Sequence, residues 1–231
     1  MQRSMIKSLS VADVISLTNA IFGVIAILFL FSNLGTCDEF RLRASFSFIL
    51  LALLADGLDG IVARKVGKSD LGEYLESMAD MTSMVIAPSA FIYYVYSESF
   101  GFLFYRHVYL LFALILFLSF GIIRLASFHL MKKKDYFIGL PASASTLILL
   151  IISFLKVEFI YILPAVIIIG AATVSDIKFP KPGVIINSIA MFLIILTLIA
   201  YNSFQSIAPL SLLIAILLYA IVGPIYLFKS K

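Results

Sequence analysis

Charged residues and cysteine are both scarce in this sequence. Only 13% of the 231 residues are charged and 62% are hydrophobic, whereas a soluble domain carries about 25% charged and about 45–50% apolar residues. The mean hydropathy is +1.12. This composition excludes an ordinary soluble globular protein and predicts an integral membrane protein.

Other classes are excluded by the same scarcity. The single cysteine, Cys37, rules out an intramolecular disulfide and a metal site built from cysteines. The net charge is +4, but the basic residues fall in short segments between apolar runs, so we expect no nucleic-acid partner. Residues 1–13 are basic and mildly amphipathic, which indicates a short interfacial lead-in rather than a cleavable signal peptide.

The apolar residues form eight runs, many of them about 20 residues long. Such runs favour helices, which satisfy their backbone polar groups internally, over the short alternating segments of a barrel. Short connections predict antiparallel neighbours, and without repeats or low-complexity tracts we expect one domain over residues 1–231. The sequence therefore predicts an all-α, polytopic bundle of about eight transmembrane helices. The runs are 14–32, 44–63, 71–96, 108–130, 140–155, 159–174, 184–201 and 207–228.

Lysine and arginine alternate between the two sides of this bundle. Twelve of the 17 fall on one side and four on the other, with Arg124 inside the fourth run. By the positive-inside rule the richer side is cytoplasmic. We therefore expect a multi-pass protein of the cell membrane with both termini, and the connection between the second and third runs, in the cytoplasm. The twelve are Arg3, Lys7, Arg64, Lys65, Lys68, Lys132, Lys133, Lys134, Lys178, Lys181, Lys229 and Lys231.

Residues 56–80 hold six of the 13 acidic side chains. A carboxylate within a membrane costs several kcal/mol unless it is compensated, so such residues indicate function. Asp56 and Asp59 are three residues apart and Glu76 and Asp80 are four apart, so each pair shares one helix face. The charge count places both pairs at the cytoplasmic ends of adjacent helices.

These acids predict a metal site for phosphoryl transfer. Carboxylates without histidine or cysteine suit Mg²⁺ or Mn²⁺, with Ca²⁺ behind them, and two pairs could hold two ions that clamp a phosphate. Arg64 is well placed to bind a diphosphate. A structural salt-bridge cluster is the alternative, but it would leave negative charge uncompensated. The four glycines among the acids would allow close approach of a ligand or of another helix: Gly57, Gly60, Gly67 and Gly72.

The same stretch resembles the signature of the CDP-alcohol phosphotransferases. Residues 56–64 read DGLDGIVAR and match Asp-x-x-Asp-Gly-x-x-Ala-Arg; Gly72, Glu76 and Asp80 match the following Gly-x-x-x-Asp-x-x-x-Asp. Two departures stand out. The spacer between the two parts is seven residues, one short of the commoner length, and Glu76 replaces an aspartate. Its extra methylene shifts the carboxylate, which leaves a divergent, weakly active or non-enzymatic relative as an alternative.

The resemblance implies a reaction and roles for its residues. Asp56, Asp59, Glu76 and Asp80 would surround two metal ions, with Asp80 also the general base. Gly60 and Ala63 would let the cytidine nucleotide approach, and Arg64 and Gly72 would line its pocket. An alcohol would displace CMP at the lipid-side phosphate of a CDP-lipid. The resemblance also implies a homodimer.

Further stretches resemble the phosphatidylserine synthase branch, including its archaeal archaetidylserine synthases, and imply L-serine as the acceptor. They are SVADVISLTNAIFGVIAI, with Asn19 and Gly23 in familiar places; LESMADMTSMVIAPSAF, in which Met84 and Val85 replace the usual Phe-Gly; GIIRLASFHL; FIGLPASAS; and VSDIKFPKP.

Arg124 is the most informative residue outside the signature, because an arginine in an apolar helix usually pairs with an anion. It forms either a structural ion pair or a site for a phosphate or the serine carboxylate, and Lys133 lies close to the same cytoplasmic rim. The lysines there either follow the positive-inside rule and attract anionic membrane lipids or contact the substrate. Glycerol 3-phosphate or an inositol phosphate, as alternative acceptors, should need more arginine than Arg64 and Arg124. An acid-lined cation transporter would not explain the Gly-x-x-Ala-Arg portion.

Overall fold

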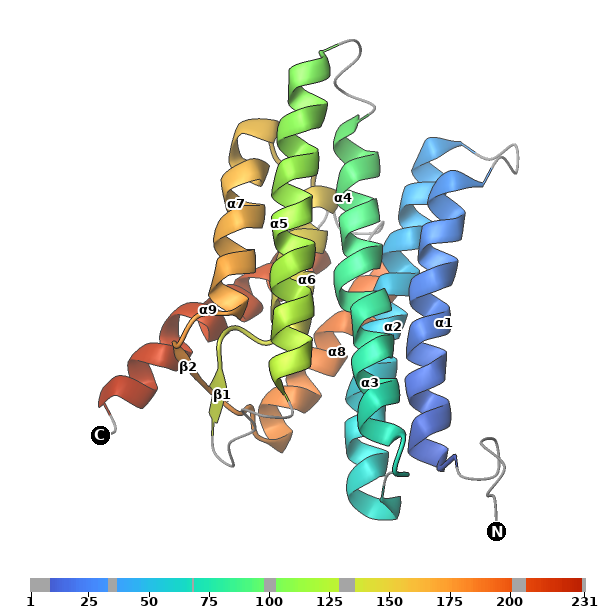
Figure 1. Ribbon diagram of the computed structural model, residues 1–231, viewed down its shortest axis with the longest axis vertical. Coiled ribbons are helices and arrows are strands. Elements are labelled where there is room, and N and C mark those ends of the chain that lie inside the picture. Colours follow the sequence, from blue (N-terminus) through green and yellow to red (C-terminus); the bar gives the residue numbers. More distant parts are fainter. Residues whose placement is uncertain are drawn as a thin grey trace.

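The computed structural model describes residues 9–32, 37–67, 69–97, 103–128, 136–200 and 207–229. Nearly all of this part of the chain is helical (Figure 1). The predicted all-α fold is confirmed, with the addition of two very short strands. In chain order the elements are α1 (Val11–Phe31), α2 (Asp38–Val66), α3 (Gly72–Asp80), the π-helix η2 (Met81–Ile86), α4 (Ala87–Ser97), α5 (Phe104–Phe128), β1 (Tyr136–Ile138), α6 (Ala142–Phe154), α7 (Phe159–Thr173), β2 (Lys178–Pro180), α8 (Val184–Ala200) and α9 (Ile207–Lys229).

The helices have the length and composition of a membrane protein. Four of them, α1, α2, α5 and α9, are long and apolar enough to cross a bilayer, whereas α6, α7 and α8 are apolar but shorter. The third predicted run is one unbroken helical path through α3, η2 and α4. Large apolar side chains remain exposed on the outer helices, for example Ile185, Phe192 and Ile199 on α8. These faces suit lipid, and the prediction of a helical membrane protein is confirmed.

Helix α2 begins earlier and ends later than the hydrophobic run predicts. Its first turn carries Asp38 and Glu39, which form ion pairs with Arg41 and Arg43. Acidic side chains are favourable near a helix N-terminus, so this charged turn extends the helix beyond its apolar part. At the other end Gly67, with φ +84°, ends the helix.

The π-helix η2 follows Asp80 directly and lies where several helices meet. A π turn leaves backbone groups out of the regular α-helical pattern and often marks a functional site. Here the Thr146 hydroxyl of α6 donates a 2.6 Å hydrogen bond to the Met84 carbonyl. Gly23 of α1 packs so tightly on Ser83 that a Cβ there would lie 2.8 Å from the Ser83 Cα. These contacts fix the backbone of η2 and hence the positions of Asp80 and Met84.

Strands β1 and β2 pair antiparallel, with Phe137 opposite Phe179. After β1 the chain turns at Gly139, whose φ is +76° and whose N–H donates to the Ile177 carbonyl at 2.8 Å. A Cβ at Gly139 would lie 2.1 Å from the Thr173 carbonyl oxygen, so only glycine fits. The sequence did not predict this sheet. It lies beside the lower end of α5 (Figure 1), from where the chain enters α6.

Most of the buried core is shared by two groups of helices, and a third, smaller cluster of Leu140, Ala144 and Phe179 lies at the sheet. One cluster joins α1, α2, α4 and α6, with Phe46 stacked on Phe154 at 4.0 Å, and the other joins α4, α5, α6 and α7 around Phe117. Helices α4 and α6 contribute to both. The ends of α2 and α5 and the beginnings of α1 and α3 all lie in the lower half of Figure 1. The residues of the predicted site are therefore gathered at one end of the bundle.

Candidate active site

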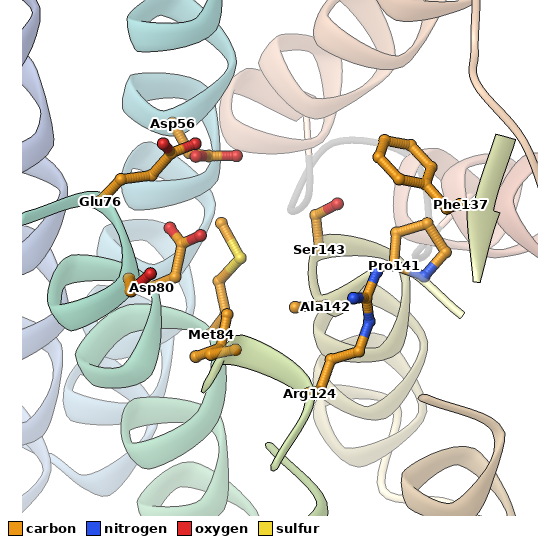
Figure 2. A pocket seen from close by; sticks show the side chains of 11 residues that line it. Asp56, Glu76, Asp80, Met84, Arg124, Phe137, Pro141, Ala142 and Ser143 are labelled. Atoms are coloured by element: carbon orange, nitrogen blue, oxygen red, sulfur yellow. The ribbon is translucent and has the colours of Figure 1, made fainter. Parts of the chain in front are cut away.

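A cavity of about 190 Å³ opens at this end of the bundle. It is bordered by residues of α2, α3, η2, α5 and α6 and by β1. Its walls differ in character, with acids on one side and an arginine on the other (Figure 2). The lining residues are Asp56, Glu76, Ser77, Asp80, Met84, Arg124, Leu125, Phe137, Pro141, Ala142 and Ser143.

The acidic wall contains three of the four carboxylates that the sequence singles out. Asp56 reaches the cavity from α2, and Glu76 and Asp80 reach it from α3, with the carboxylates of Asp56 and Glu76 facing one another (Figure 2). Asp80 accepts a 3.1 Å hydrogen bond from the Asn19 side-chain amide of α1. The structure thus brings these residues together from two helices, as their spacing predicts.

The fourth carboxylate, Asp59, lies deeper in the bundle and does not line the cavity. It is 2% exposed and accepts a hydrogen bond from the Ser16 hydroxyl of α1. It is nevertheless close enough for its charge to act on Asp80, which Asp56 and Glu76 also repel. Four neighbouring carboxylates in a mostly apolar bundle are energetically costly unless a cation neutralises their charge.

The chemistry of the donor set fits a divalent ion. Carboxylate oxygens without nitrogen or sulfur donors suit Mg²⁺ or Mn²⁺, and three of the acids face one space. As these side chains lie, no three acid, histidine or cysteine groups within the described ranges are close enough to hold one ion. The residue types fit, while the coordination geometry is not formed by the protein side chains alone.

The opposite wall carries Arg124, which is 9% exposed and reaches the cavity from α5. Ser143 and Pro141, at the start of α6, and Phe137 of β1 complete this wall (Figure 2). Met84 rises between the two walls, with its thioether end directed into the space (Figure 2). An anionic group on this side would meet Arg124 while its other end faced the carboxylates.

The residues expected at the nucleotide pocket lie outside this cavity, toward the end of α2 and the start of α3. Gly60 is partly exposed and no atom lies within 4 Å of the position its Cβ would take. Arg64 is exposed and Ala63 is partly buried, whereas Gly72 is buried. Lys133 lies outside the described residues. The structure therefore leaves a second, open surface next to the acids on which a larger group could lie.

Sequence reasoning missed several residues that support the site. Ser16, which binds Asp59, lies three residues before Asn19, which binds Asp80. Polar residues at that spacing share one face of the apolar helix α1, and this signal could have identified Ser16. Thr146 and Ser143 carry no such signal, because nothing local shows that the start of α6 meets η2.

Comparison with known proteins places the chain in a family. A family model described as CDP-alcohol phosphatidyltransferase matches residues 9–225. The chain belongs to the CDP-alcohol phosphatidyltransferase family. The match includes the signature residues and reaches from α1 into α9. This family depends on divalent metal ions, in agreement with the carboxylate donors.

Three curated relatives are similar in sequence to this chain. It is 34% identical over 178 residues to a CDP-diacylglycerol–serine O-phosphatidyltransferase of Methanocaldococcus jannaschii, which covers 76% of each chain. It is 27% identical over 226 residues to a protein of the same name from Helicobacter pylori, covering 87% of this chain and 93% of the relative. It is 31% identical over 180 residues to the archaetidylserine synthase of Methanothermobacter thermautotrophicus, covering 75% and 70% respectively.

Proposed function

We propose that this protein is a membrane phospholipid synthase that transfers a phosphatidyl- or archaetidyl-type group from a CDP-lipid to the hydroxyl of L-serine and releases CMP. The observation that carries this proposal is the two-walled cavity, in which Asp56, Glu76 and Asp80 face Arg124. The names of the relatives support the choice of acceptor. One membrane domain over residues 1–231 would hold the whole site.

The reaction needs a base, a phosphate-binding side and a leaving group. The serine oxygen attacks the phosphorus that carries the lipid, a new P–O bond forms, and the bond to the bridging oxygen breaks as CMP leaves. Asp80 accepts the hydroxyl proton, because it lies on the acidic wall and its position is set by Asn19. Two Mg²⁺ or Mn²⁺ ions held by Asp56, Asp59, Glu76 and Asp80 would neutralise the charge on the diphosphate.

The nucleotide would lie on the open surface next to the acids. Gly60 leaves room for it, and Arg64 at the exposed end of α2 can reach a phosphate. Ala63 and Gly72 would form the rest of this surface. Placing CMP here leaves the cavity itself for the acceptor.

Serine fits the opposite wall better than a phosphorylated acceptor does. Among the described residues lining the cavity, Arg124 is the single cation. One guanidinium matches one carboxylate in a paired geometry, whereas a phosphate with two charges would call for a second cation. Lys133, at the rim, would bind a phosphate of the CDP-lipid rather than the acceptor. The protein would lie among the lipids of the cell membrane, with its site open to the cytoplasm. It would form a homodimer.

Release of CMP by the purified protein tests this function directly. Protein in detergent or lipid nanodiscs is incubated with CDP-diacylglycerol or CDP-archaeol, Mn²⁺ or Mg²⁺ and one acceptor from a panel of L-serine, glycerol 3-phosphate and inositol phosphate. We expect CMP and a serine-containing lipid with L-serine alone. A preference for a phosphorylated acceptor would overturn the choice of serine, and no CMP with any acceptor would overturn the enzymatic function.

A further inference from the structure

Met84 lies between the two walls of the cavity. It belongs to η2, four residues after Asp80, and lines the cavity together with Asp80 and Arg124. Figure 2 shows its sulfur and methyl group in the space between the Asp80 carboxylate and the Arg124 guanidinium. An acceptor that binds Arg124 through its carboxylate must extend past Met84 to present its hydroxyl to Asp80.

The backbone of Met84 cannot withdraw to make room for a longer acceptor. Met84 is 2% exposed and its carbonyl accepts the 2.6 Å hydrogen bond from Thr146. The residues on either side of it are equally confined: Ser83 packs on Gly23 and Val85 packs on Gly121. Any added length in the acceptor must therefore be accommodated by displacing the Met84 side chain.

A thioether offers the acceptor no strong hydrogen bond, so Met84 acts on size and not on polarity. In an apolar pocket one methylene group changes discrimination by about 10–200-fold. The cavity has a volume of about 190 Å³, and the Met84 side chain occupies the space between its two recognition groups.

We infer that Met84 is a specificity-determining residue that restricts the acceptor to a hydroxy amino acid with a single carbon between its α-carbon and its hydroxyl. This inference rests on the proposed function and deepens it. The space between Asp80 and Arg124, which the Met84 side chain limits, would accept serine and exclude its longer homologues.

The test compares L-serine with L-homoserine, which has one more methylene and the same carboxylate and amine. Wild-type protein, Met84→Ala and Val85→Ala are compared by kcat/KM for CMP release with each acceptor. We expect Met84→Ala to raise the homoserine-to-serine ratio by about tenfold or more. Val85→Ala is the matched control, because Val85 is also 2% exposed on η2 but packs on Gly121 and does not line the cavity. It should leave the ratio unchanged, because the hydrogen bond from Thr146 still holds the Met84 backbone in this variant.

A shorter truncation, Met84→Val, is measured in parallel, because complete loss of a buried methionine side chain leaves a cavity and can prevent folding. An unchanged ratio in whichever Met84 variant folds overturns the inference. So does a wild-type protein that uses homoserine as well as serine, or a Val85→Ala variant that shifts the ratio equally. A wild-type protein inactive with serine would instead overturn the proposed function, so the two failures are distinct.

Discussion

At the scale of single residues, Asp80 stands out because its carboxylate both accepts a hydrogen bond from a neighbouring helix and lines the cavity. Asn19 donates to one of its carboxylate oxygens, which orients the side chain, and three neighbouring carboxylates repel it. A carboxylate surrounded by other negative charges is stabilised when it binds a cation or a proton. This is why we assign it the acceptance of the serine proton.

Replacing Asp80 by asparagine tests that assignment. Asp80→Asn keeps the size of the side chain but removes the base, so we expect the rate of CMP release to fall by about 10²–10⁴-fold. Binding of the CDP-lipid, measured by equilibrium titration, should be largely retained, because the other acids remain. Glu73→Gln is the control, since Glu73 lies on the exposed side of the same helix and should have a normal rate. A normal rate for Asp80→Asn would remove its role as the base.

Glu76 is the position at which the signature departs from its family. The structure places its carboxylate opposite that of Asp56 on the acidic wall (Figure 2). If it binds metal, Glu76→Asp should preserve or raise activity, whereas Glu76→Ala should lower it and raise the Mn²⁺ concentration needed for half-maximal rate. The measurement is CMP release across a Mn²⁺ titration. Full activity of Glu76→Ala at every Mn²⁺ concentration would show that Glu76 is not a ligand.

At the scale of elements, the small sheet shapes the arginine side of the cavity. Phe137 comes from β1, and the turn at Gly139 leads directly into Pro141 and the start of α6. The turn is closed by backbone hydrogen bonds from Gly139 to Ile177 and from Leu140 to Ala172. The sheet therefore ties the wall of the cavity to the end of α7.

A substitution at Gly139 should disrupt this wall. Gly139→Ala places an L side chain in a left-handed conformation, at a cost of about 1–2 kcal/mol, and adds a clash with the Thr173 carbonyl. We expect a lower midpoint of thermal unfolding and reduced CMP release. Gly183→Ala is the matched control, because nothing lies within 4 Å of its Cβ position. Equal behaviour of the two variants would show that the turn does not require glycine.

The helices and the acidic wall could be predicted from sequence because their signals are local. Glu76 and Asp80 share a helix face by their spacing, and both line the cavity, whereas Asp59, which the spacing places on the same face as Asp56, lies deeper in the bundle. The sheet could not be predicted in this way, since Phe137 and Phe179 pair across a long stretch of chain that includes two helices. No local pattern marks the π-helix at Met81–Ile86 either. The Met84 carbonyl in it accepts a hydrogen bond from the Thr146 hydroxyl, which belongs to a helix distant in the sequence.

At the scale of the whole molecule, the charge distribution agrees with the arrangement of the helices. The end of α2, with Arg64 and Lys65, lies at the same end of the bundle as strand β2, which begins at Lys178 and is followed by Lys181 (Figure 1). Lys178 lies 5.1 Å from the centre of the Tyr136 ring, and Lys181 lies 5.3 Å from the centre of the Phe137 ring. The proposed site is at this basic end, and by the positive-inside rule it should face the cytoplasm.

The natural cysteine allows this orientation to be tested in intact cells. Cys37 is exposed and precedes α2, so it lies at the end of the bundle opposite Lys65. A membrane-impermeant maleimide should label Cys37 from outside the cells, whereas in Cys37→Ser/Lys65→Cys labelling should require permeabilised cells. Cys37→Ser alone controls for background and should not be labelled. The reverse pattern would place the acidic wall on the outer face of the membrane, where serine from the cytoplasm could not reach the site. The orientation therefore bears directly on the reaction, because the water-soluble acceptor must enter from the side to which the cavity opens.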